Sequence, residues 1–291
     1  RPLVFIDWDD WWGRGGILDI FHKNLNSLIR RLLTFMEETI PLYGDAVTVT
    51  CETLRKRALG VGVKPERIFF LPNGTDMKLK HRINILEARK SAGLPENAII
   101  YTCGKSSFNW INPRNDPLWD LLIAHNNVVK VFPNAFLCFL GKGSEKCVAI
   151  AKKLGIDKNV IYADWQSSEK YPVYLASSDF MIMPLSNRGM FDRSRIPLRL
   201  LDYMAMGLPI IATDLPEIKT LLEDYGLLFK PNDPADLTNK IINAITCLES
   251  LKNKATKARE NVIKKYSWRK LAKELETMYV YLLNNACNIG N

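Results

Sequence analysis

One stretch of the sequence, residues 196–209, combines a basic and an acidic side chain at a spacing that suits phosphate and ribose binding. Pro197 favours the first turn of a helix, and Gly207 favours its end. Arg199 and Asp202 are three residues apart, so they share a face near the helix start. A cation beside a helix N-terminus forms a phosphate site, and a carboxylate one turn further on can accept two ribose hydroxyls. An Arg–Asp surface pair on an amphipathic helix accounts for the same spacing.

Acidic and aromatic residues alternate in a second cluster, residues 7–12, which follows the first apolar run. Aromatic side chains at the end of a strand usually pack in a core or at its rim. The alternative is that Asp10, with Trp11 or Trp12, lines a cleft near a transferred sugar or its acceptor. The glycines of residues 13–16 would keep the following loop adaptable.

The cysteines and histidines do not form a metal-binding or disulfide pattern. The six cysteines are scattered without a CxxC pair, and the three histidines do not cluster. Buried free thiols in a reducing compartment are therefore expected, and no metal site is indicated.

Short apolar runs alternate with segments of helical length along the chain. The runs predict strands at 3–7, 46–50, 67–71, 98–102, 135–140, 159–162, 179–183, 209–212 and 226–229. Between 25 and 36, apolar residues recur at three- and four-residue spacing, which predicts a helix, and residues 233–285 are helical throughout. On the helix after Pro197, we expect Leu198, Leu201, Ala205 and Met206 to face the core. The alternation of strands and helices predicts parallel sheets with crossover helices, and so an α/β protein.

Composition places the chain among ordinary globular proteins. It has 291 residues, of which 47% are hydrophobic and 24% charged, which excludes a disordered or fibrous chain. No window has the apolar length of a membrane span, and the acidic residues after position 6 exclude a signal peptide there. The net charge of +9 suits an anionic partner, which could be nucleic acid, a phosphate-bearing small molecule or a lipid surface.

A turn-rich, polar stretch at 72–97 interrupts this alternation and predicts a linker. We assign residues 1–80 to a first domain, 81–265 to a second, and 266–291 to a C-terminal helix. The second domain holds six predicted strands, enough for a complete doubly wound sheet, whereas the first holds three.

Residues 197–213 resemble the donor-site signature of family 4 glycosyltransferases, which are retaining enzymes of the GT-B fold. Five further segments resemble this family and occur in its order: Asp7–Trp12, Leu71–Asp76, Gly141–Gly143, Tyr225–Phe229 with Pro231–Asp233, and Tyr266–Trp268. The resemblance implies two Rossmann-like domains that face each other across a cleft, with the first domain incomplete in this chain. The last helix would cross back to the first domain.

The activity that the resemblance implies is transfer of a sugar from a UDP- or GDP-linked donor, with retention of configuration. The acceptor would be a glycan, a lipid-linked molecule or another compound. No cofactor or metal is implied, because basic side chains and helix amides stabilise the leaving diphosphate in this family. Two alternatives stay open: a non-catalytic subunit that binds nucleotide sugar or a partner, and a nucleotide-sugar epimerase of the same fold.

Carried over residue by residue, the resemblance places Asp202 at the position of the ribose-binding glutamate and Arg199 at that of the lysine near the diphosphate. The catalytic residues it implies are Asp10, Lys105 and Arg199. The donor-binding residues it implies are Gly104, Arg114, Gly141, Lys142, Gly143, Ser194, Pro197, Leu198 and Asp202. Ser194 stands where many members carry a glutamate; a serine can hydrogen-bond a sugar hydroxyl but supplies no charge.

The segment 252–273 carries nine basic residues and one acidic residue, Glu260. A solvated helix face accounts for this charge, and so does a peripheral contact with an anionic membrane that presents a lipid-linked acceptor. Nucleic acid is not expected as a partner, because no recognition motif accompanies the charge. The expected location is the cytoplasm, with contact at the inner face of the membrane.

The start of the chain resembles strands that occur late in the first domain of family members. The glycine-rich loop and the histidine that family members place on earlier strands are absent. We therefore expect residues 1–291 to be the C-terminal part of a longer protein, with one edge of the first sheet unpaired.

Overall fold

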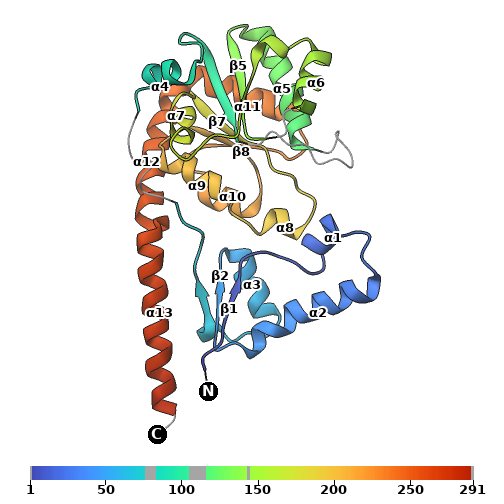
Figure 1. Ribbon diagram of the computed structural model, residues 1–291, viewed down its shortest axis with the longest axis vertical. Coiled ribbons are helices and arrows are strands. Elements are labelled where there is room, and N and C mark those ends of the chain that lie inside the picture. The colour runs from blue at the N-terminus through green and yellow to red at the C-terminus, as the bar shows by residue number, and fades with distance from the viewer. Residues whose placement is uncertain (1, 76–82, 105–115, 143–144, 290–291) are drawn as a thin grey trace.

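Two separate parallel sheets organise the chain (Figure 1). The computed structural model describes residues 2–75, 83–104, 116–142 and 145–289. In this part of the chain the first sheet has three strands and the second has six. All nine predicted strands are present, each within two residues of its predicted bounds, and the predicted α/β class is confirmed.

The first sheet has the order β1-β2-β3, with β1 at Phe5–Trp8, β2 at Ala46–Val49 and β3 at Ile68–Phe70. All residues of the central strand β2 are buried, as expected for a strand covered on both faces. One face packs on α3 (Glu52–Gly60) through a small core that includes Trp8, Val49 and Leu54. This sheet carries the loop after β1, where Asp10 lies.

The predicted helix between 25 and 36 is present and longer, as α2 (Ser27–Tyr43). It follows α1 (Ile17–Phe21), and the Asn26 side chain caps it by accepting a hydrogen bond from the Leu28 amide. Its apolar stripe lies on the surface of the described structure, with Leu28 72% and Leu32 56% exposed. The opposite, polar face of α2 turns toward the loop after β1 through Glu37.

The second sheet has the order β6-β5-β4-β7-β8-β9, and all its strand pairs are parallel. Its strands are β4 (Ile99–Cys103), β5 (Ala135–Leu140), β6 (Val160–Asp164), β7 (Phe180–Met183), β8 (Ile210–Thr213) and β9 (Leu227–Phe229). The chain adds strands outward from β4 in one direction and then from β7 in the other. The topological switch point therefore lies between the neighbours β4 and β7. Open α/β sheets bind ligands at the carboxyl ends of the strands beside this point.

Helices cover both faces of the second sheet, with one hydrophobic core on each face. They are α4 (Ile85–Ala92), α5 (Pro117–Val131), α6 (Glu145–Leu154), α7 (Tyr171–Ala176), α9 (Leu198–Ala205), α10 (Pro216–Leu222) and α11 (Pro234–Thr246). The short helix α8 (Met190–Arg193) lies instead beside α1 at the junction with the first domain. Short 3-10 turns lie at Pro65–Arg67 and Asp157–Asn159.

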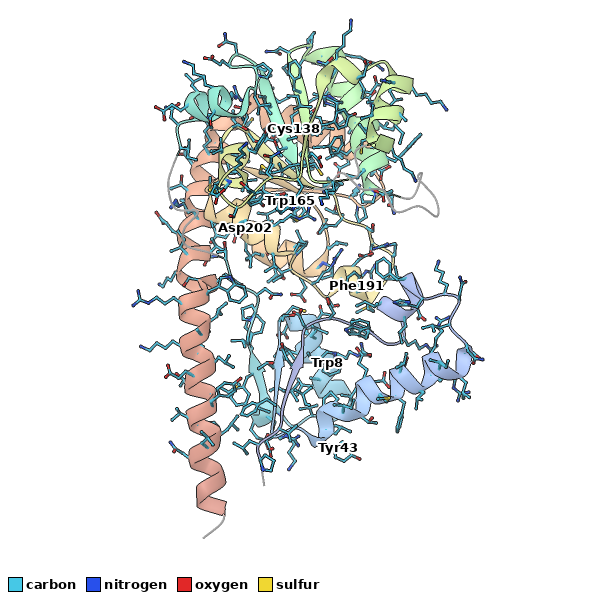
Figure 2. All side chains as sticks on the ribbon, in the orientation of Figure 1. Trp8, Tyr43, Cys138, Trp165, Phe191 and Asp202 are labelled. Carbon is cyan, nitrogen blue, oxygen red and sulfur yellow. The ribbon has the colours of Figure 1, made fainter. Side chains whose placement is uncertain are left out.

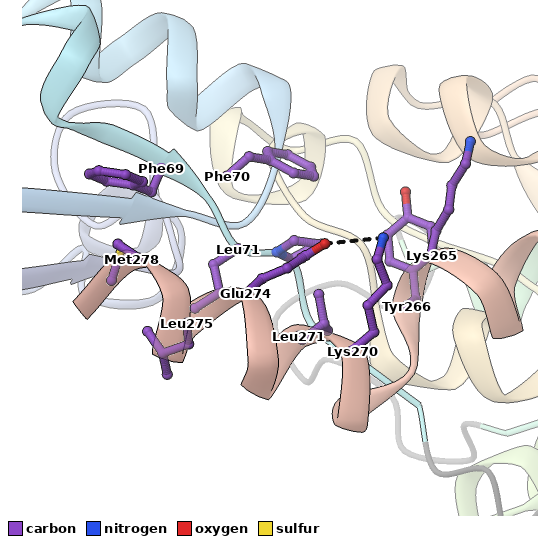
Figure 3. Close-up of a pocket in the computed structure, with 11 residues that line it drawn as sticks. Phe69, Phe70, Leu71, Lys265, Tyr266, Lys270, Leu271, Glu274, Leu275 and Met278 are labelled. Atoms are coloured by element: carbon purple, nitrogen blue, oxygen red, sulfur yellow. Dashed lines mark ion pairs between the residues drawn. The ribbon is translucent and has the colours of Figure 1, made fainter. Parts of the chain in front are cut away.

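Two long helices end the chain, α12 (Leu248–Tyr266) and α13 (Trp268–Ile289). In Figure 1, α13 leaves the second domain and runs alongside the first. Its Tyr279 packs edge-on against Phe5 of β1, with ring centroids 4.6 Å apart. Figure 3 shows the groove of about 460 Å³ between α13 and the β3 segment, where Lys270 and Glu274 form an ion pair of 3.1 Å.

The two domains also meet at loops that follow their strands. Glu217, at the start of α10 in the second domain, accepts a hydrogen bond of 2.8 Å from the Thr53 amide in the first turn of α3. The N-cap residue of α3, Cys51, provides no side-chain cap, so Glu217 supplies that function from the other domain. The Cys51 thiol instead donates to the Ser194 carbonyl at 3.0 Å.

Replacing Glu217 should therefore loosen the contact between the domains as well as α3. We expect Glu217→Ala to lower the free energy of unfolding by about 1–2 kcal/mol, because the amide at Thr53 loses its partner. Urea unfolding followed by circular dichroism measures the change, with the exposed Glu223→Ala on the same helix segment as the control. Equal stability of the two variants would contradict the capping role.

Candidate functional site

Helix α9 begins and ends where the sequence predicts. Pro197 is its N-cap in an extended conformation, and Gly207 adopts a φ of 68° just after the helix, a left-handed conformation that favours glycine. Arg199 and Asp202 both belong to this helix, and Figure 2 labels Asp202 on the side of the second domain that faces the first.

Three of the four apolar residues expected to face the core are buried: Leu201, Ala205 and Met206. The prediction for Leu198 is wrong, because its side chain is 50% exposed. It occupies the first turn of α9, where Leu200 and Leu201 take the core positions, and so it lies on the surface beside Pro197.

Arg199 lies at the end of β4, which is one side of the switch point. A Cβ added to Gly104 would lie 3.3 Å from Arg199 Cδ and would clash with the Tyr203 hydroxyl, so this position has no room for a side chain. The Gly104 amide donates a hydrogen bond to that hydroxyl, and burial raises the pKa of Tyr203. The structure thus brings Gly104 and Arg199 together, with Tyr203 holding the end of the strand.

Asp202 is tied to the segment that joins the domains. Its Oδ1 accepts a hydrogen bond of 2.9 Å from the Thr75 hydroxyl. Thr75 is 1% exposed, and its amide donates to the Tyr266 carbonyl at 2.8 Å. Thr75 also forms a β-bridge with Ser267. The carboxylate expected to bind ribose is therefore oriented by the linker.

The glycine-lysine segment after β5 lies on the same carboxyl edge of the sheet. Gly141 has a φ of 148°, which suits glycine, and Lys142 Nζ lies 5.8 Å from the centre of the Trp165 ring. Gly143 lies outside the described residues, as do Lys105 and Arg114.

Asp10 lies in the loop after β1 and is half-buried. Burial raises the pKa of its carboxyl, the charge of Asp9 raises it further, and the charge of Arg195 opposes the rise. Since Arg195 belongs to the second domain, Asp10 faces that domain at the junction.

Ser194 is 1% exposed, and its hydroxyl has no hydrogen-bond partner in the described part of the chain. Its carbonyl accepts the Cys51 thiol of the first domain. The position of Ser194 is therefore at the domain junction, within the loop that leads into α9.

A cluster that was not predicted from the sequence surrounds Asp192, whose side chain is fully buried. Asp192 accepts hydrogen bonds from Arg188 Nε at 2.9 Å and from Arg195 Nη2 at 3.3 Å. Burial lowers the pKa of Arg195, while Asp192 and Asp10 raise it. The signal in the sequence was the repeat of arginines around one aspartate between 188 and 195.

The described residues hold no group of three or more histidine, cysteine or carboxylate side chains that could bind a metal ion. Cys51, Cys103, Cys138 and Cys147 are buried free thiols, whereas Cys247 is exposed and Cys287 lies outside the described side chains. Among the described helices, none combines the length and apolar character that a membrane span requires.

The raised pKa of Asp10 predicts a stability cost that depends on pH. The folded protein binds the proton of the Asp10 carboxyl more tightly than the unfolded chain does. The loss of stability is therefore absent below the pKa of Asp10 in the unfolded chain and complete above its pKa in the folded protein. We expect Asp10→Asn to raise Tm at about pH 7 and to raise it less at about pH 3. The exposed Asp224→Asn serves as a control. An equal shift at both pH values, or a lower Tm at about pH 7, would refute this assignment.

Comparison with known proteins identifies relatives of this chain. A family model described as "Glycosyl transferases group 1" matches residues 110–247. The N-acetyl-alpha-D-glucosaminyl L-malate synthase of Bacillus anthracis is 29% identical over 249 residues, which cover 84% of this chain and 61% of that protein. The chitobiosyldiphosphodolichol beta-mannosyltransferase of Candida albicans is 25% identical over 251 residues, covering 84% of this chain and 54% of that protein. The chain thus spans less than two thirds of the length of these relatives.

Solved structures share the fold. The sucrose-phosphate synthase from Thermosynechococcus elongatus superposes with a TM-score of 0.72 at 17% identity, covering 97% of this chain and 74% of that one. The Anabaena protein Alr3699/HepE in complex with UDP gives a TM-score of 0.72 at 15% identity, covering 97% and 72%. By the matched family model and the related proteins the chain is similar to the group 1 glycosyltransferases, and it has the GT-B fold of the solved structures.

Proposed function

We propose that this protein transfers a sugar from a nucleoside-diphosphate sugar to an acceptor, with retention of configuration. The observation that carries the proposal is the placement of Arg199 beside Gly104 at the switch point, with Asp202 one helical turn further on. A basic group, helix amides and a carboxylate are the groups that a diphosphate and a ribose require. Solved relatives of the same fold contain UDP or UDP-glucose, which supports this donor class.

The nucleoside would bind through Asp202, whose carboxylate accepts ribose hydroxyls. The Thr75 hydrogen bond to Oδ1 fixes the orientation of this carboxylate before the ligand arrives. Gly141 and Lys142 would border the donor on the neighbouring strand, with Gly143 following them.

The diphosphate would lie at the N-terminus of α9, between Pro197 and Gly104, with its charge stabilised by Arg199. The exposed side chain of Leu198 would border it. By resemblance, Lys105 and Arg114 would add positive charge. Fixed cations and amides stabilise the charge that develops on the leaving diphosphate while the sugar passes through an oxocarbenium-like state.

The sugar would extend toward the first domain, where Asp10 and Ser194 lie at the junction. Asp10 would contact the transferred sugar or its acceptor, and the Ser194 hydroxyl would hydrogen-bond a sugar hydroxyl. The donor contacts would thus come from the second domain, including Ser194, and the first domain would contribute Asp10 on the side of the acceptor.

A glycan or a lipid-linked molecule is the acceptor class that we propose. Most basic side chains of 252–273 are exposed on α12 and α13, which fits a peripheral contact with an anionic membrane. The buried free thiols fit a reducing compartment such as the cytoplasm, with the protein at the inner face of the membrane.

Removing the ribose or phosphate contact should weaken nucleotide binding. We expect Asp202→Ala and Arg199→Ala each to raise the Kd for UDP or GDP by about 10- to 100-fold, because each loses a charge-assisted hydrogen bond. Isothermal titration against a panel of nucleoside diphosphates measures this, with the exposed Glu249→Ala and Arg269→Ala as matched controls. Wild-type affinity in Asp202→Ala would rule out the assigned site.

Turnover separates the proposed enzyme from its alternatives. We expect the wild-type protein to release nucleoside diphosphate from one member of a panel of UDP- and GDP-sugars, measured by a coupled assay with and without candidate acceptors. Binding without any release would instead identify a non-catalytic subunit. Conversion of one nucleotide sugar into its epimer would identify an epimerase.

A further inference from the structure

A largely buried carboxylate on α2 holds the loop that carries Asp10. The Glu37 side chain is 10% exposed and lies against residues 11–13. Its Oε1 accepts hydrogen bonds from the Trp12 amide at 2.7 Å and from Trp8 Nε1 at 3.3 Å. Its Oε2 accepts from the Gly13 amide at 2.6 Å and from Arg57 Nη2 at 2.7 Å.

Arg57 joins Glu37 from helix α3 and completes this cluster. Its side chain is 5% exposed, and its guanidinium stacks over Trp11 at 3.8 Å and over Trp8 at 5.2 Å from the ring centres. A buried, paired and stacked guanidinium has one geometry available, whereas an exposed ion pair has many. The loop residue Trp11 is therefore fixed by Arg57 while Glu37 fixes the next two amides.

The fixed loop reaches the second domain. The Gly15 carbonyl accepts a hydrogen bond of 2.7 Å from the Met190 amide at the start of α8. Close by, the rings of Phe21 and Phe191 pack edge-on with centroids 5.7 Å apart. Figure 2 labels Phe191 at this junction between the domains. Since α8 leads directly into Ser194 and α9, this contact joins the Asp10 loop to the segment that precedes Arg199.

We infer that Glu37, together with Arg57, is a positioning residue for sugar transfer. It sets where Asp10 lies relative to the donor site by fixing residues 11–13 and, through Gly15, the contact with α8. The inference rests on the proposed function and extends it to a residue that touches neither substrate. Two observations support it: all four hydrogen bonds of the carboxylate go to this loop, its flanking tryptophan and Arg57, and the loop in turn contacts the donor domain.

Two variants loosen the loop from opposite sides. Glu37→Gln presents an amide in place of the carboxylate, so part of the four-donor set loses its acceptor. Gly13→Ala leaves Glu37 intact, but its Cβ would clash with Glu37 Oε2 and displace the loop. The matched controls are Glu38→Gln, whose carboxylate is 45% exposed and 3.5 Å from the same Arg57, and Gly60→Ala, whose Cβ would meet nothing within 4 Å.

Hydrogen exchange measured by mass spectrometry reports the coupling without any substrate. We expect exchange of the peptide covering 188–194 in the second domain to become about tenfold faster in both variants, because the Met190 amide loses its acceptor at Gly15. Both controls should exchange as the wild type does. Unchanged exchange of this peptide in both variants would overturn the inference.

Kinetics then separate positioning from simple loss of structure. For the donor that the wild type turns over, we expect kcat to fall roughly 10- to 100-fold in both variants while the donor Kd, set on the second domain, stays within about twofold. Unchanged kcat, or a parallel loss of kcat, donor affinity and Tm, overturns the inference. A wild type that neither binds nor turns over any donor overturns the proposed function itself, and the exchange result distinguishes that case.

Discussion

The hydrogen bonds of Thr75 join the three parts of the chain that must meet for the proposed donor site to form. Its amide binds the carbonyl of Tyr266 where α12 ends, its carbonyl accepts the Trp268 amide at the start of α13, and its hydroxyl binds Asp202 on α9. A buried threonine cannot leave these partners without exposing unpaired polar groups. The linker therefore fixes both the direction of α13 and the carboxylate of Asp202, which we propose binds ribose.

Contacts away from this hinge hold the two domains together at their loops. Glu217 caps a helix of the other domain, the Cys51 thiol binds the Ser194 carbonyl, and Gly15 binds Met190. The Cys51 and Gly15 contacts are single hydrogen bonds, and Glu217 accepts one from the amide and one from the hydroxyl of Thr53. Each bond is worth about 1 kcal/mol, so together they favour one arrangement without making it permanent. Such an arrangement is compatible with the proposed function, which requires that a donor enter and leave between the domains.

Sequence periodicity predicted the strands because parallel strands buried on both faces are near-continuous apolar runs, as in β7 and, apart from Thr48, in β2. It also predicted α9, because Pro197 and Gly207 mark its ends. Periodicity did not predict the exposure of side chains whose surroundings come from segments distant in the sequence. Nothing local shows that Leu198 is exposed or that Glu37 is buried, since both depend on which loop packs beside them. The roles of the site residues came from family resemblance, because the spacing of Arg199 and Asp202 alone also fits a surface pair.

The central claim is that one nucleoside-diphosphate sugar binds at the carboxyl ends of β4 and β7. A crystal structure of the protein with the nucleotide sugar that it binds tests this directly. We expect the ribose to contact Asp202 and the diphosphate to lie within hydrogen-bond distance of Arg199 and the first amides of α9. A nucleotide bound elsewhere, or a ribose held without Asp202, would contradict the account.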